Sequence, residues 1–333
     1  MKSVVLISAV VSFLTVLFLT PWIIKYLRKI GLLVVDQNKP EKPLVPISGG
    51  LVVMGGFFVG LMVFIFFRTF FPSEGLILDD ISLKYIFGSI VSIMIITFVG
   101  FIDDLLIKSS KESSAGLNQW QKPLLTLLAA VPLMAVSLGE TIIQLPILGR
   151  VDFGIIYPLI LVPIGVVGAA NMVNMLGGLN GLETGMGIVY IGMLGLYASY
   201  YERHMAALIA LLVFVSLIAF YFFNMVPAKI LPGNSLTYFL GGSLAVIAIV
   251  GNIEKAALIV AIPFFVEFIL KWRSKFKADS FGYYKDGKLH SKYKKVYSLT
   301  HLFLKTGKFT EREIVWSFIL MELVISSFMW FIR

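Results

Sequence analysis

The chain has 333 residues, of which 58% are apolar and only 14% charged, and its mean hydropathy is +0.91. This composition is typical of a protein embedded in a bilayer and excludes an ordinary soluble enzyme. The absence of cysteine excludes disulfides and thiolate chemistry, and three scattered histidines do not suggest a zinc site. The formal charge of +9 is concentrated between apolar runs, so we expect no nucleic-acid partner.

Ten apolar runs approach the roughly 20 residues that a membrane span requires. The sequence therefore predicts an all-α polytopic membrane protein with about ten transmembrane helices, forming a single domain over residues 1–333. The expected spans are 4–24, 47–71, 85–102, 123–139, 154–170, 184–200, 205–225, 236–250, 255–270 and 314–331. The first run is too long for a signal peptide and lacks a cleavage site, so we expect it to be retained.

The distribution of positive charge predicts how the spans are oriented. Of the 28 Lys and Arg residues, 21 lie in the loops 25–45, 103–122, 171–183, 226–235 and 271–313. By the positive-inside rule these loops are cytoplasmic, and both termini lie outside. The basic loop 271–313 is expected to contact anionic membrane lipids. On the outer side, 141–154 alternates β-branched residues around a glycine and predicts a small extracytoplasmic β-hairpin.

The polar residues suited to chemistry lie in the predicted cytoplasmic loops. Asp36–Lys39, followed by prolines, is interpreted as a rigid polar entry into the second span. Asp103 and Asp104 close the third span, where the helix dipole is already negative, so a cation or basic partner is expected beside them. A solvated helix end is the other interpretation. Lys122 begins the fourth span, where a positive charge indicates a nearby anion, although a snorkelling lysine is the commoner explanation.

The loop 171–183 combines three amides, three glycines and a carboxylate between two spans. Glycines let a backbone approach a phosphate closely, and the oxygens of amides such as Asn174 are hard ligands that suit a magnesium-bound diphosphate. A polar turn between helices is the alternative. Further along, Asn234 follows two prolines and a glycine and is expected to cap the next helix.

Together these loops favour a membrane enzyme or transporter that acts on a diphosphate with magnesium at the membrane surface. The position at the surface indicates a lipid phosphate as the second reactant. Glu267 and Glu322 lie inside the last two spans. Acids within a membrane are costly and often mark functional pathways, but the sequence assigns neither a role.

Three ordered motifs carry a family resemblance: Gly100-Phe-Ile-Asp103-Asp104, Asn171-x-x-Asn174-x-x-x-Gly178-x-Asn180-Gly181-Leu182-Glu183, and Phe223-Asn-x-x-Pro-Ala-x-x-x-x-Gly-Asn234. The chain resembles the polyprenyl-phosphate N-acetylhexosamine-1-phosphate transferases, and within them most the dolichyl-phosphate GlcNAc-1-phosphotransferase branch of archaea and eukaryotes. The resemblance implies transfer of GlcNAc-1-phosphate from UDP-GlcNAc to dolichyl (polyprenyl) phosphate at the cytoplasmic face. The products would be GlcNAc-diphosphodolichol and UMP, in the first step of lipid-linked oligosaccharide assembly for N-glycosylation.

The resemblance also implies roles for single residues. Asp103 and Asp104 match the paired acids that activate the lipid phosphate or support the metal, and Lys122 matches a lysine near the pyrophosphate. Asn174 matches an amide that ligates Mg²⁺, for which Mn²⁺ is the substitute, and Asn180 matches a residue of the uridine pocket. The other two polar residues of that motif are expected to bind substrate; they are Asn171 and Glu183.

Two departures from the family pattern matter. Asn234 stands where the family usually has an aspartate as the second metal ligand. The last loop lacks both the histidine cluster of the bacterial relatives and the Arg/His pair of the eukaryotic enzyme, which leaves Lys275, Lys277 and His301 as candidates for holding the sugar and pyrophosphate. The missing cluster argues against a phospho-MurNAc-pentapeptide substrate. The last loop and the lack of cysteine favour an archaeal cell membrane over the endoplasmic reticulum.

Several alternatives remain open at this point. A flippase or transporter of a nucleotide- or lipid-linked sugar is the competing class, although such proteins more often place polar groups near the midplane of the membrane. The same transfer with another N-acetylhexosamine is a second enzyme interpretation. Direct transfer and an enzyme-bound intermediate both fit the residues, and a homodimer is a further expectation.

Overall fold

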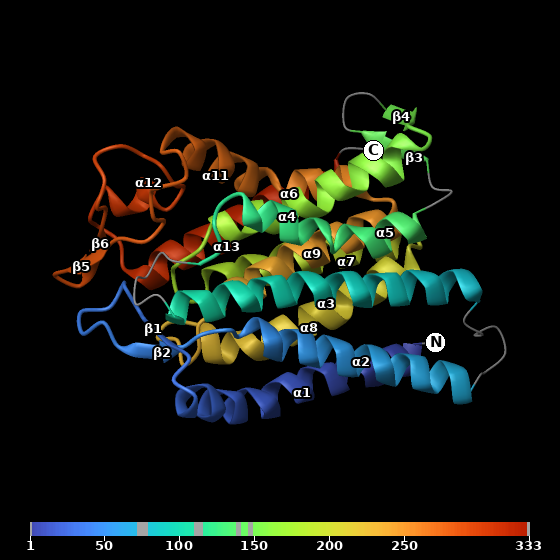
Figure 1. Ribbon diagram of the computed structural model, residues 1–333, viewed down its shortest axis with the longest axis horizontal. Helices are drawn as coiled ribbons and strands as arrows, with labels where there is room; N and C mark the ends of the chain where they lie inside the picture. The colour runs from blue at the N-terminus through green and yellow to red at the C-terminus, as the bar shows by residue number, and fades with distance from the viewer. Residues whose placement is uncertain (1, 72–78, 110–115, 138–140, 146–148, 332–333) are drawn as a thin grey trace.

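The computed structural model describes residues 2–71, 79–109, 116–137, 141–145 and 149–331, and these residues form a bundle of long helices (Figure 1). Residues 110–115 of the polar segment after the third span and residues 146–148 of the predicted hairpin lie outside the described residues. The described helices are α1 (Lys2–Lys29), α2 (Gly50–Phe70), α3 (Asp80–Ser109), α4 (Gln121–Leu127), α5 (Ala130–Val136), the π-helix η1 (Tyr157–Leu161), α6 (Val162–Met175), α7 (Leu182–Tyr200), α8 (His204–Asn224), α9 (Gly233–Gly251), α10 (Glu254–Val260), α11 (Ile262–Arg273), α12 (His301–Leu304), α13 (Glu311–Ser327) and the 3-10 helix η2 (Phe328–Trp330).

Short antiparallel strand pairs lie at the two ends of the bundle. The pairs are β1 (Leu33–Val35) with β2 (Leu44–Pro46), β3 (Ile142–Leu145) with β4 (Gly149–Asp152), and β5 (Tyr283–Lys285) with β6 (Lys288–His290). The pairing of β3 with β4 confirms the hairpin that the sequence predicted. The other two pairs lie in loops in which we predicted no strands.

The chain runs back and forth along the bundle, so that its connections gather at two ends. The β1–β2 and β5–β6 pairs and α12 lie at one end, whereas β3–β4, the start of α1 and the end of α13 lie at the other (Figure 1). Each of the ten predicted spans corresponds to a helical segment between these ends. The polar loops therefore share one end, as the charge distribution predicted.

Seven helices of the described residues are long and apolar enough to cross a membrane; they begin at Ser3, Gly50, Asp80, Tyr157, His204, Gly233 and Glu311. The other three predicted spans differ from continuous apolar helices. The span 123–139 is divided into α4 and α5, and 255–270 is divided into α10 and α11, where Pro263 lies in the first turn of α11. The third, α7, is long enough but less apolar, because it contains Glu183, four glycines and three tyrosines.

Helix α9 is the centre of the bundle, because most of its residues from Ser235 to Ile249 are buried. Glycines let its neighbours pack backbone to backbone. A Cβ atom on Gly100 of α3 would meet the backbone oxygen of Asn234 at 2.3 Å, and one on Gly241 would meet the backbone oxygen of Ala169 in α6 at 2.5 Å. Small residues allow such close approach between helices in membranes. As a result, the polar ends of α3 and α6 lie directly against the start of α9.

Two predicted boundaries are wrong, and both change the setting of the site. Helix α3 continues to Ser109, so Asp103 and Asp104 lie in its last two turns and not at its end. Helix α6 continues to Met175, so Asn171 and Asn174 project from a helix and not from a loop. In both cases the helix extends beyond the apolar run, because contacts with neighbouring segments satisfy the polar side chains, as described below.

Candidate functional site

A cavity of about 1130 Å³ opens at the polar end of the bundle. It lies between α4, the end of α6, the start of α9, the loop after β1 and the segment that follows α11. Six of the predicted site residues are among those that line it: Lys122, Asn171, Asn174, Asn180, Glu183 and Asn234. The two predicted catalytic acids lie behind this wall with no exposed surface. The structure thus brings six of the predicted residues to one cavity and leaves the two acids in the layer behind it.

Asp103 is held between a backbone amide and a lysine. Its Oδ1 accepts a hydrogen bond of 2.6 Å from the Leu117 N–H, and its Oδ2 lies 2.7 Å from Lys122 Nζ. A Cβ atom on Gly116 would meet Asp103 Oδ1 at 2.1 Å, so the chain can turn past the carboxylate only with glycine there. The prediction that Lys122 has an anion beside it is confirmed, and that anion is Asp103.

Asp104 caps a helix that begins 129 residues later in the chain. Its Oδ1 accepts from the Asn234 N–H at 2.6 Å, and its Oδ2 accepts from the Ser235 N–H at 3.2 Å and from the Ser48 hydroxyl at 2.9 Å. A carboxylate at a helix N-terminus is favoured by the free N–H groups and by the helix dipole. The prediction that Asn234 caps α9 through its own side chain is wrong, because Asp104 takes that position.

The two amides of α6 face different neighbours. Asn171 donates through Nδ2 to the Val167 carbonyl at 2.8 Å and to the Thr126 hydroxyl of α4 at 3.1 Å. Asn174 Oδ1 accepts from the Thr237 hydroxyl of α9 at 2.6 Å. The Asn234 side chain, which also lines the cavity, makes no hydrogen bond with the described residues. Asn174, at the end of α6, and Asn234, at the start of α9, therefore both place uncharged amide oxygens that could ligate a metal near the first turns of α9.

The turn between α6 and α7 is fixed by its glycines and by hydrogen bonds to two distant carboxylates. Gly178 and Gly181 have positive φ angles of 97° and 84°, which glycine adopts without strain. Asn180 donates through Nδ2 to Asp36 at 2.8 Å, and its backbone N–H donates to Glu311 at 2.8 Å. This turn carries the predicted uridine-pocket residue in a defined position.

The carboxylates that hold this turn are paired with one lysine. Lys39 lies 3.3 Å from Asp36 and also contacts Glu311 at the start of α13. Glu183 stays within its own turn, where its carboxylate accepts from the Gly178 N–H at 2.8 Å. The sequence analysis interpreted Asp36–Lys39 as a rigid polar entry into the second span and named no partners for these residues. Their partners are 144 and 272 residues away, so no local pattern could connect them.

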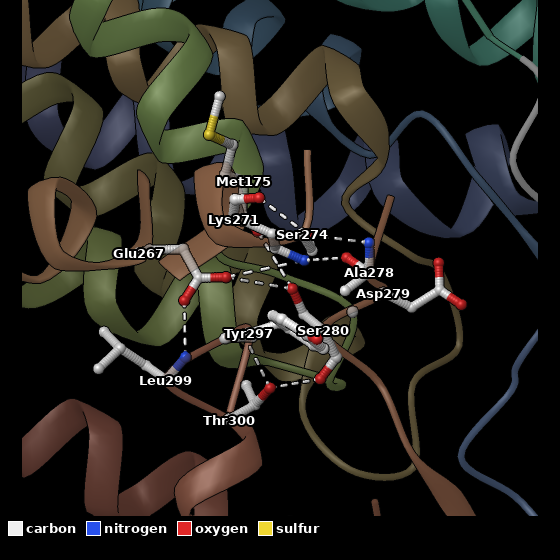
Figure 2. A network of polar contacts seen from close by, with 12 residues as sticks. Met175, Glu267, Lys271, Ser274, Ala278, Asp279, Ser280, Tyr297, Leu299 and Thr300 are labelled. Atoms are coloured by element: carbon white, nitrogen blue, oxygen red, sulfur yellow. Dashed lines mark hydrogen bonds and ion pairs between the residues drawn. The ribbon is translucent and has the colours of Figure 1, made fainter. Parts of the chain in front are cut away.

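The last polar loop forms a network of polar contacts with α11 and the end of α6 (Figure 2). Glu267 of α11 accepts from the Leu299 N–H at 2.7 Å and lies 3.8 Å from Lys271, one turn later in the helix. Ser280 donates to the Met175 carbonyl at the end of α6 at 3.1 Å, and the Thr300 hydroxyl donates to the Ser280 carbonyl. These contacts fix the segment 278–281, which lines the cavity, onto α6 and α11.

The predicted candidates in this loop do not line the cavity. Lys275 and Lys277 are exposed, whereas His301 is buried within the loop. His301 Nε2 donates to the Asp279 carbonyl at 2.9 Å, and its Nδ1 accepts from the Tyr297 N–H at 3.2 Å. Burial lowers the pKa of His301, which favours this neutral form. The lysine of this region that lines the cavity is Lys271, which the sequence placed at the boundary of the last loop.

The site can therefore hold an anion and a long apolar chain together. Two lysines and several amides line the cavity beside an apolar wall; the wall includes Leu33, Val35, Leu44, Ile107 and Trp120. Among the described residues no group of three or more His, Asp or Glu side chains could hold a metal ion. Single carboxylates of Asp36, Glu183 and Asp279 line the cavity, and those of Asp36 and Glu183 already accept hydrogen bonds, so amide oxygens and a substrate diphosphate would supply most ligands of a bound cation.

Comparison with known proteins identifies the family. The model of glycosyl transferase family 4 matches residues 86–252, which span the acids of α3, the amides of α6 and the start of α9. The chain belongs to glycosyl transferase family 4. Family membership confirms the family resemblance that the three motifs carried.

Two archaeal relatives of this family are similar over nearly the whole chain. A protein of Saccharolobus solfataricus is 38% identical over 315 residues, which cover 93% of this chain and 90% of that protein. A protein of Sulfolobus acidocaldarius is 36% identical over 318 residues, with the same shares. Both are provisionally named UDP-N-acetylglucosamine--dolichyl-phosphate N-acetylglucosaminephosphotransferase.

A bacterial branch of the family is more distant. The phospho-N-acetylmuramoyl-pentapeptide-transferase of Bacillus cytotoxicus is 28% identical over 276 residues, covering 79% of this chain and 80% of that protein. The order of similarity agrees with the sequence prediction, which favoured the dolichyl-phosphate branch over the bacterial one.

Proposed function

We propose that this protein transfers N-acetylglucosamine 1-phosphate from UDP-N-acetylglucosamine to dolichyl phosphate. In this reaction an oxygen of the lipid phosphate attacks the β-phosphorus of the donor, the bond between that phosphorus and UMP breaks, and UMP leaves. The observation that carries the proposal is one cavity that gathers Lys122, Asn174, Asn180 and Asn234 beside an apolar wall. The names of the two archaeal relatives support the same reaction.

The apolar wall suits the lipid substrate. Leu44 and Trp120 are 60% and 66% exposed at the cavity rim, so a polyprenyl chain in the membrane can contact them while its phosphate enters. Inside, Lys122 is the cation that meets the diphosphate. Its charge is partly balanced by Asp103, which orients the ammonium group without removing it from the cavity. Asn171 and Asn180 lie on the same wall and are proposed to bind the donor.

Magnesium fits this site only together with the diphosphate. Mg²⁺ prefers oxygen ligands and is usually held by one or two carboxylates plus substrate phosphates. Asn174 and Asn234 supply oxygens without charge, and the carboxylates of Asp103 and Asp104 are already occupied by hydrogen bonds. When bound, the metal would neutralise charge on the diphosphate, with Mn²⁺ as a substitute. The two asparagines would hold and orient it.

We propose that the transfer is direct. A covalent intermediate needs a nucleophile that reaches the donor, and both acids have no exposed surface and face backbone N–H groups. Asp103 acts through Lys122, and Asp104 acts through the start of α9. On this view neither acid forms a bond to phosphorus.

The charge distribution supports a cytoplasmic active site, because the polar end of the bundle carries most of the lysines and arginines. The two archaeal relatives support an archaeal cell membrane over the endoplasmic reticulum. A homodimer and a single folding domain remain predictions from the sequence.

The direct test is formation of the lipid product. Purified protein, UDP-GlcNAc labelled in the sugar, dolichyl phosphate and magnesium should give a labelled lipid and UMP in equal amounts. The same protein in sealed liposomes tests the alternative of a transporter. Movement of labelled sugar across the bilayer without a lipid product would replace the proposed transfer with transport, and a panel of UDP-sugars identifies the N-acetylhexosamine.

A further inference from the structure

The cavity has a second cation, and this one is buried and is left unexplained by the predicted roles. Lys122 and Lys271 are the cations among its described lining residues, and they lie on α4 and α11, which both pack against α6. The side chain of Lys271 is only 9% exposed. A lysine with so little contact with water is costly unless an anion compensates its charge.

Neighbouring groups of the protein compensate the positive charge of Lys271 only in part. Its ammonium group donates to the Ala278 carbonyl at 2.6 Å and lies 3.8 Å from Glu267 Oε1, which is beyond hydrogen-bonding distance (Figure 2). An ammonium group has three N–H donors. Apart from the long ion pair with Glu267, the other two donors have no acceptor among the described residues, and Lys271 is one of the residues that line the cavity.

The Glu267 carboxylate is itself committed elsewhere. Glu267 Oε2 accepts from the Leu299 N–H at 2.7 Å, and Ser280 donates to Oε1 at a long 3.4 Å. The same Ser280 hydroxyl binds the Met175 carbonyl, directly after Asn174. Glu267 thereby fixes the position of Lys271 next to the amides of α6. Lys271 still has N–H donors that are free to bind a ligand.

We propose that Lys271 binds the diphosphate or sugar phosphate of the nucleotide-sugar donor, and that Glu267 is the residue that positions it. This proposal rests on the proposed function. It assigns the donor two cations, one on each of two helices beside α6, which together neutralise part of the negative charge of its diphosphate. The proposal also gives a role to Glu267, the buried acid inside the predicted ninth span.

A substitution series separates this role from a purely structural ion pair. Lys271→Met removes the cation but leaves Glu267 buried without its partner, which destabilises a protein by itself. The double variant Glu267→Gln/Lys271→Met removes both charges and should regain thermal stability. Lys305→Met, at an exposed lysine of the same loop, is the matched control.

We expect the KM for UDP-GlcNAc to rise about tenfold to a hundredfold in Lys271→Met and equally in the double variant, which is the usual size of one hydrogen bond to a charged group. The KM for dolichyl phosphate should stay within twofold. A double variant whose donor KM returns to within twofold of the parent would overturn the proposal, because the pair would then be structural.

Calorimetry with UDP and magnesium gives a readout that does not depend on turnover. UDP should bind at least tenfold more weakly to the double variant than to the parent or to Lys305→Met. Equal UDP affinity in all three proteins overturns the role of Lys271. Absence of UMP release by the parent, with UDP binding still weakened in the variant, overturns the transfer reaction and leaves the diphosphate site standing.

Discussion

The α4 side and the α11 side of the cavity carry the same pair of residue types in different arrangements. On the α4 side Lys122 is 24% exposed and lies 2.7 Å from Asp103. On the α11 side Lys271 is 9% exposed and lies 3.8 Å from Glu267. Both carboxylates are fully buried, and both are fixed by a backbone N–H, from Leu117 and Leu299 respectively.

The difference shows how one chain can assign separate tasks to two lysine–carboxylate pairs. The short contact on the α4 side ties Lys122 to Asp103, and we propose that it orients this lysine for the reacting phosphates. The long contact on the α11 side leaves Lys271 with donors for a ligand. The two sides should then respond differently to loss of charge, and substitutions can measure the difference.

The largest effect is expected on the α4 side. Asp103→Asn keeps an oxygen to accept from the Leu117 N–H but removes the charge that orients Lys122. We expect kcat to fall roughly 10²–10³-fold, as it does when a group that stabilises the transition state is removed, with little change in donor KM. Initial rates of UMP release measure this. A kcat within twofold of the parent would exclude any role of the pair in turnover.

Substitution of the neighbouring acid, Asp104, should lower the stability of the protein, because Asp104 caps α9 and does not orient a lysine. Asp104→Asn keeps one oxygen but puts an NH₂ group against the N–H group of either Asn234 or Ser235, and a buried donor without an acceptor costs about 1–3 kcal/mol. Ser48→Ala removes only one hydrogen bond and should cost about 1 kcal/mol. Thermal unfolding of both variants checks this order. Unchanged stability in Asp104→Asn would show that capping α9 is not its role.

A third change alters the charge between the two sides. Asn234→Asp gives the proposed metal site one anionic oxygen, so magnesium should bind the free protein more tightly and a lower concentration should give the half-maximal rate. In the parent, magnesium and donor should strengthen each other's binding by roughly 5–150-fold. Calorimetry with and without UDP-GlcNAc measures both effects. Equal magnesium affinity in all four experiments would place the metal elsewhere.

The smallest effect concerns the loop behind Lys271. Burial lowers the pKa of His301 in the folded protein, so the unfolded chain binds the proton more readily. Stability from this residue is therefore complete above the unfolded pKa of about 6.5 and is lost as the pH falls below it. The melting temperature should drop more between pH 7.5 and pH 5.5 in the parent than in His301→Gln. Parallel curves would mean that His301 does not contribute.

The sequence predicted the fold well because a membrane protein encodes its spans locally, in long apolar runs. It also found six residues of the cavity wall, because the glycine–amide motif and Lys122 are close to the ends of spans. It did not predict the contact of Asp104 with Asn234, 130 residues away, or that of Asp36 with Asn180, 144 residues away. Such contacts depend on helix packing, not on local pattern.

Lys271 was missed for a different reason. Glu267 and Lys271 are spaced one helical turn apart, which is a local signal of an ion pair on one helix face. From the sequence, Lys271 is nevertheless interpreted as the first residue of the basic loop 271–313, because that loop contains 12 lysines and arginines. Only the fold shows that this lysine turns back into the cavity while Lys275 and Lys277 face outward.

The central claim is that the bond broken is the diphosphate bond of the donor. The measurement that tests it most directly uses UDP-GlcNAc labelled with phosphorus-32 at the β-phosphate, with and without dolichyl phosphate. We predict that the label moves into the lipid, one label for each UMP released, and that no UMP forms without the lipid. Label retained in UDP, or bound to the protein when the lipid is absent, would contradict direct transfer of the sugar phosphate.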